Sequence, residues 1–165
     1  MKRTIACAIF FVCAFTAQAN DKPINDKVIL RNLDRAFEIA AADLGTMTVI
    51  YENECGEKFP AWCSFYGQGK LEIRGIADTI DSPPSNITIT YTPDGDPNPF
   101  LLNVGILVSI CEPQMKQEER GKIIASIIQI AGKKKEGSIV EGENCDYSVT
   151  DLLGNIMVVA AKAVN

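Results

Sequence analysis

Four cysteines are the residues whose type and spacing bear most directly on chemistry: Cys55, Cys63, Cys111 and Cys145. Cysteines can form a redox pair, bind a metal ion or close a disulfide. A thioredoxin-type redox pair is spaced C-x-x-C, whereas seven residues separate Cys55 from Cys63. A structural zinc site needs close-spaced pairs or histidines, but Cys111 and Cys145 are 34 positions apart and the chain has no histidine. The spacing favours disulfides, and of the three connectivities we expect Cys55–Cys63 and Cys111–Cys145.

The lack of histidine also removes the common nucleophilic mechanisms. Ser-His-Asp and Cys-His arrangements are excluded, and the two expected disulfides use every cysteine after residue 19. Carboxylate pairs remain, and Asp78 with Asp81 is an example in an expected loop. A catalytic carboxylate needs burial or a charged partner that shifts its pKa, and loop acids usually serve solubility. We therefore expect no catalytic residue and no cofactor.

A second acidic loop has part of a calcium-binding pattern. Asp94-Gly95-Asp96-Pro97-Asn98 supplies the first three ligand positions. The pattern then fails, because the sixth position is Pro99 instead of Gly and the twelfth is Gly105 instead of Glu. Turn chemistry explains the stretch without an ion. We expect no metal site, with an irregular calcium loop as the alternative.

Three aromatic residues surround the first cysteine pair, which we interpret as a stapled hairpin tip. Phe59, Trp62 and Phe65 form either an exposed contact patch or, in the alternative interpretation, a group in which Trp62 packs on the disulfide. The candidate contact surface consists of these three residues together with Asp94 and Asp96 of the second loop.

The first nineteen residues have the three parts of a secretory leader. Lys2 and Arg3 are basic, residues 5–15 are apolar and uncharged, and Ala17-Gln18-Ala19 has the small-x-small pattern of a cleavage site. The apolar run is short for a membrane span, so an uncleaved anchor is the weaker alternative. The sequence predicts a signal peptide at 1–19 and a periplasmic or secreted domain at 20–165, without a transmembrane segment.

The expected mature chain has 146 residues, the size of one ordinary domain. It carries 14 basic and 21 acidic residues, a net charge of −7. An acidic chain is poorly suited to nucleic acid or anionic lipid, which attract basic surfaces. We therefore expect no nucleic-acid partner.

The hydrophobic periodicity predicts three helices. The first begins at Asn25 or Asp26 and ends at Gly45, the second is a buried helix over 100–111, with a strand as the alternative, and the third covers 116–132. Alternating residues predict strands at 47–51, 70–76, 86–91, 138–141, 145–149 and 156–161. The order α-βββ-αα-βββ is typical of a single α+β domain. We expect an antiparallel sheet of about five to six strands, packed by three helices on one face and stapled by disulfides.

Elimination of catalytic groups leaves a binding function. We expect a small exported, non-catalytic protein of inhibitor or immunity type, which binds a protein partner through its stapled loop at 54–65 and the loop at 92–98. The alternative is a carrier that holds a small apolar ligand between the sheet and the 100–111 helix. The partner's identity and the oligomeric state do not follow from the sequence.

Overall fold

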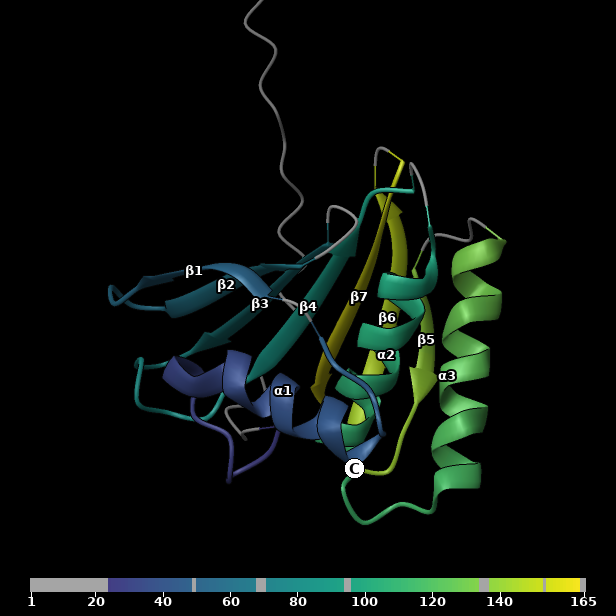
Figure 1. Ribbon diagram of the computed structural model, residues 1–165, viewed down its shortest axis with the longest axis horizontal. Helices are drawn as coiled ribbons and strands as arrows, with labels where there is room; N and C mark the ends of the chain where they lie inside the picture. Colours follow the sequence, from purple (N-terminus) through teal and green to yellow (C-terminus); the bar gives the residue numbers. More distant parts are fainter. Residues whose placement is uncertain are drawn as a thin grey trace, which may run out of the picture.

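Seven strands form one antiparallel sheet, and three α-helices cover one of its faces (Figure 1). The computed structural model describes residues 24–48, 50–67, 71–93, 96–133, 137–152 and 154–163. The predicted leader and Asp94 lie outside these ranges. The strands are β1 (Ile50–Gly56), β2 (Ala61–Gly67), β3 (Leu71–Ala77), β4 (Asn86–Tyr91), β5 (Ser138–Glu141), β6 (Cys145–Leu152) and β7 (Asn155–Lys162). The helices are α1 (Leu33–Asp43), α2 (Asn98–Cys111) and α3 (Gln117–Gly132), and the 3-10 turn η1 (Leu30–Asn32) precedes α1.

The predicted α+β class, single domain and antiparallel sheet are confirmed, but the number of strands is higher than expected. The strand order across the sheet is β1-β2-β3-β4-β7-β6-β5. The additional strand is β2, which lies within the segment interpreted as a loop. Residues 61–67 pair along their whole length with β3, and residues 62–67 also pair with β1. The chain order is therefore α-ββββ-αα-βββ.

The two faces of the sheet differ because successive side chains of a strand point to opposite sides. Apolar side chains point toward the helices. Examples are Phe65, Ile73, Ile89 and Tyr147, each at most 1% exposed. On the other face lie half-buried residues of mixed polarity, among them Trp62, Thr88 and Met157. None of the described helices covers that second face (Figure 1).

The first helix begins later than predicted. The chain forms the 3-10 turn η1 from Leu30 before the α-helix starts at Leu33. Asn25, one of the two residues at which the helix was expected to begin, instead donates a hydrogen bond from its side-chain amide to the carbonyl of Ile110 at 2.9 Å. The segment before α1 is thus fixed by tertiary hydrogen bonds, including those from the Leu30 and Arg31 amides to the carbonyls of Ser82 and Ile80.

The predicted helices over 100–111 and 116–132 are confirmed. Pro99 occupies the first turn of α2, where a missing amide hydrogen costs nothing, and Pro113 follows the helix end. In α3 only Ile123 and Ile127 are buried, so this helix is largely exposed. No helix among the described residues is both long and apolar enough to cross a membrane.

Candidate functional site

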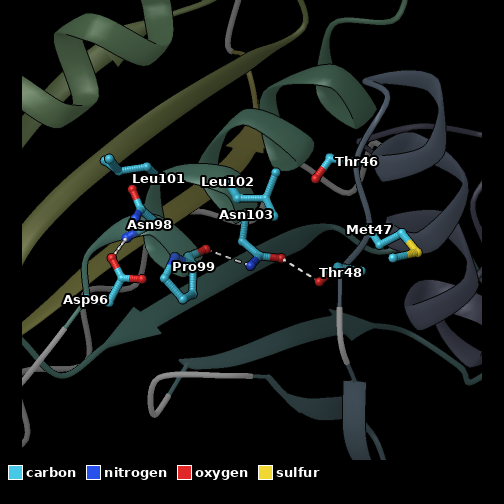
Figure 2. A pocket seen from close by; sticks show the side chains of 9 residues that line it. All are labelled: Thr46, Met47, Thr48, Asp96, Asn98, Pro99, Leu101, Leu102 and Asn103. Atoms are coloured by element: carbon cyan, nitrogen blue, oxygen red, sulfur yellow. Dashed lines mark hydrogen bonds between the residues drawn. The ribbon is translucent and has the colours of Figure 1, made fainter.

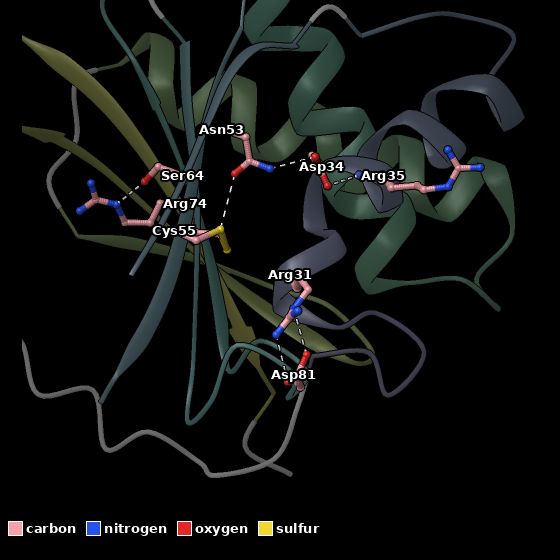
Figure 3. Close-up of a disulfide and its surroundings, with 9 residues drawn as sticks. Arg31, Asp34, Arg35, Asn53, Cys55, Ser64, Arg74 and Asp81 are labelled. Atoms are coloured by element: carbon pink, nitrogen blue, oxygen red, sulfur yellow. Dashed lines mark hydrogen bonds and ion pairs between the residues drawn. A yellow bond between two sulfur atoms is a disulfide. The ribbon is translucent and has the colours of Figure 1, made fainter. Parts of the chain in front are cut away.

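The hairpin of β1 and β2 carries the confirmed disulfide. Cys55 and Cys63 are direct partners in the register, and their Cα atoms are 4.1 Å apart. Beyond them all four residues of the connection 57–60 are exposed. Figure 3 shows how Asn53 links this hairpin to α1, because its side-chain amide donates to Asp34 Oδ2 at 2.9 Å. The disulfide and this bond restrain an edge hairpin whose connection projects into solvent.

The three aromatic residues near the disulfide do not form one patch. Phe59 lies in the exposed connection and is 80% exposed. Phe65 is 1% exposed and packs edge-on against Phe37, with 5.2 Å between the ring centroids. The prediction that Phe65 belongs to a contact surface is therefore wrong, since strand alternation turns it toward the helices.

Trp62 lies on the uncovered face of the sheet. Cys63, the next residue, is buried on the helix side, so strand alternation places Trp62 on the side away from the disulfide. The alternative in which Trp62 packs on the disulfide is wrong for this reason. Its ring lies instead across Gly56, where a Cβ atom would clash with the indole.

Arg74 is held above this ring by a small polar network. Its guanidinium carbon is 5.2 Å from the Trp62 ring centroid, which is within the range of a cation–π contact. Arg74 Nε donates to Ser64 Oγ at 2.7 Å, and its Nη2 atom lies 2.9 Å from Glu72 Oε1. The Ser64 hydroxyl completes the network by donating to Glu72 at 3.1 Å. A hydrogen bond to Ser64 and an ion pair with Glu72 thus hold the Arg74 guanidinium over the Trp62 ring on the uncovered face.

Asp96 lies at the other end of the sheet. Its Oδ1 atom accepts a hydrogen bond from the Asn98 amide at 3.0 Å and borders an open hollow of about 470 Å³ beside the start of α2 (Figure 2). Asn103, 3% exposed, donates to the Pro99 carbonyl at 2.7 Å and accepts from the Thr48 hydroxyl at 3.3 Å. The buried amide is therefore bonded within the protein on both sides.

The structure does not bring the two predicted contact loops together. The register places Ile50 of β1 level with Tyr91, the residue just before the 92–98 loop, whereas the hairpin connection follows Gly56 at the opposite end of β1. Seven residues of strand span roughly 20 Å. Phe59 and Asp96 consequently belong to different ends of the sheet.

A buried polar cluster lies where α2 ends and β6 begins, and its central residue, Glu112, was not predicted from the sequence. The Glu112 side chain is fully buried and accepts hydrogen bonds at 2.9–3.0 Å from the backbone amides of Asn144 and Cys145 and from the Asn144 side chain. Cys111, Cys145 and Tyr147 complete the cluster. The Tyr147 hydroxyl has no hydrogen-bond partner among the described residues, and burial raises its pKa well above the ordinary value.

Cys111 and Cys145 are fully buried free thiols in this structure, and the second predicted disulfide stays a prediction. Burial raises the pKa of the Cys111 thiol, and the adjacent Cys145 thiol raises it further. In the described part of the chain, no three His, Cys, Asp or Glu side chains are grouped so as to hold a metal ion. Asp78 and Asp81 are exposed, and Asp81 forms an ion pair with Arg31 at 3.0 Å.

The space between the sheet and α2 is filled by side chains. Ile89 from the sheet and Val104 and Leu107 from α2 are all 0% exposed. The hollow beside Asp96 is open, and a second one, bordered by Tyr66, Leu71 and Thr92, lies at the same end of the sheet. Neither hollow lies between the sheet and α2.

Comparison with known proteins gives no relative: no family model, no curated protein and no solved structure matches this chain.

Proposed function

We propose that this is a small exported, non-catalytic protein that binds another macromolecule, of inhibitor or immunity type, and that the β1–β2 hairpin makes the contact. The observation that carries the proposal is Phe59, a large apolar ring that is 80% exposed on a connection closed by a disulfide. Removing such a ring from water on binding is favourable. A cross-linked hairpin also loses little conformational entropy on binding, which improves affinity.

The uncovered sheet face next to the hairpin supports the same proposal. Tryptophan and arginine are the residue types most enriched among the energetically dominant positions of protein interfaces. Trp62 and Arg74 present both types beside each other, already oriented by the network with Ser64 and Glu72. A partner surface that packs against Phe59 would also cover Trp62 and Arg74.

The first test is capture of partners by the oxidised protein from an envelope extract of its source organism, with mass spectrometry of what is retained. The partner is then purified and its affinity measured by calorimetry. Phe59→Ala should weaken binding by at least about tenfold, the loss expected for an interface hot spot. Trp62→Ala should have a similar effect.

The matched control is Ile139→Ala. Ile139 is 65% exposed on β5, the edge strand farthest from the hairpin, so its replacement should leave the affinity unchanged. The midpoint of thermal unfolding of Phe59→Ala should equal that of the wild type, because an exposed ring contributes little to stability. Equal affinity of Phe59→Ala, Trp62→Ala and the wild type would exclude the hairpin as the contact. A constant added small-molecule mass in native mass spectrometry, without a protein partner, would favour the carrier instead.

A further inference from the structure

The two free thiols meet at the junction of α2 and β6. Cys111 is the last residue of α2 and Cys145 the first residue of β6, and both are 0% exposed. Glu112, the residue after Cys111, accepts a hydrogen bond from the backbone amide of Cys145 at 3.0 Å through its carboxylate. This bond holds the end of the helix against the start of the strand. Two cysteines that are 34 positions apart in the sequence are therefore neighbours in the fold.

The side chains of these cysteines also interact. Burial raises the pKa of the Cys111 thiol, and the Cys145 thiol raises this pKa further; the same two thiols add to the effect of burial in raising the pKa of Tyr147. A single buried cysteine commonly acts as a small apolar residue. Here, however, two buried thiols lie on either side of the hydrogen bond between Glu112 and the Cys145 amide, in a chain whose other described cysteines are already joined.

We propose that Cys111 and Cys145 form a second disulfide, made while the chain folds and inaccessible afterwards. The two thiols lose two protons and two electrons as their S–S bond forms. A disulfide donor, either oxidised glutathione or the disulfide of a protein oxidase, is cleaved and reduced to two thiols. Because neither sulfur is exposed in the folded protein, the donor reaches them only before the core closes.

A non-reducing peptide map tests the bond directly. The full chain is refolded with oxidised glutathione until the Cys55–Cys63 link is complete, alkylated and digested with trypsin. The Cys55–Cys63 link joins peptides 36–58 and 59–70 and is the internal control. The proposed bond predicts a second linked pair, peptides 75–116 and 136–162. Alkylated Cys111 and Cys145 on separate peptides, with the control link intact, would overturn the proposal.

A double variant isolates the second bond. In Cys55→Ala/Cys63→Ala, the proposed disulfide should resist dithiothreitol in native buffer and be reduced rapidly in denaturant. Protein reduced in denaturant and refolded should melt about 10 °C below the oxidised form, since a cross-link over this separation restricts the unfolded chain. Rapid reduction in native buffer would show that the bond is accessible, and equal melting temperatures would show that it does not constrain the chain; either result contradicts the proposal.

Discussion

Phe59 and Phe65 lie six positions apart on one hairpin, yet their rings are 80% and 1% exposed. Between them the chain leaves the exposed connection and enters β2, where alternation turns Phe65 onto Phe37. The same kind of side chain therefore serves two purposes on this hairpin. One ring is available to a partner, and the other fixes the hairpin to α1.

These two rings give a matched pair of substitutions for stability. Phe65→Ala should lower the free energy of unfolding by about 3–5 kcal/mol, because it leaves a cavity in a packed core. Phe59→Ala should change it by less than about 0.5 kcal/mol. Urea denaturation followed by circular dichroism measures both, and equal losses would contradict the assignment of the two rings to core and surface.

At this scale the sequence predicted the hairpin and its disulfide but misplaced one aromatic ring of the candidate contact surface, that of Phe65. Trp62 and Phe65 are three positions apart, and on a strand such residues face opposite sides. Pro60 and Gly67 give the segment the composition of a loop, which hides the alternation of a strand. Ala61, Cys63 and Phe65 occupy alternate positions, and Trp62 lies between the first two. This alternation is the signal in the sequence that distinguishes the side of Phe65 from the side of Trp62.

Among the elements, the turn between β5 and β6 depends on Gly142. Its amide donates to the Cys145 carbonyl at 2.8 Å. A Cβ at this position would clash with that carbonyl oxygen and with the Glu112 carboxylate, which itself caps the turn. The absence of a side chain at 142 thus permits α2 and β6 to meet.

Gly142→Ala should therefore destabilise the protein by about 1–3 kcal/mol, the usual cost of forcing extra atoms into a packed site. The control is Gly121→Ala. Gly121 lies inside α3 with open space around its Cα, so alanine there should stabilise by up to about 1 kcal/mol through helix propensity. Thermal unfolding of both variants measures the difference, and a neutral Gly142→Ala would show that the turn can relax.

The elements that sequence analysis predicted well are those with strong local patterns, namely α2, α3 and the strands with clean alternation. Strand β2 has no such pattern, because Pro60, two cysteines and nearby glycines resemble loop composition. The first helix begins later than its local pattern predicts, because the Asn25 side chain has a tertiary partner, the Ile110 carbonyl. The Glu112 cluster depends in the same way on contacts between distant segments.

For the whole molecule, the pairing of β4 with β7 joins two half-sheets. Strands β1 to β4 are consecutive neighbours, as are β5 to β7, and only residues 86–91 and 156–161 connect the two sets within the sheet. Antiparallel neighbours follow from short connections, but this central pairing spans α2 and α3 and has no local sequence signal. The strand order was for that reason beyond prediction from the sequence.

Hydrogen exchange should follow this order. Amides of β4 and β7 are paired on both sides and should exchange most slowly, close to the rate set by global unfolding, whereas those of β1 and β5 at the edges should exchange fastest. Exchange measured by mass spectrometry on peptides from each strand tests this. If β7 exchanged as fast as β5, the two half-sheets would be opening independently of each other.

The central place of β7 also has a consequence for how the protein is made. A chain still being synthesised presents β1–β4 as a partial sheet whose β4 edge is open, and it does so until the strand latest in the sequence has been added. The polypeptide therefore remains incompletely folded throughout most of its translation. The seven-stranded sheet cannot close before residues 155–162 have been synthesised, however early the segments before them emerge.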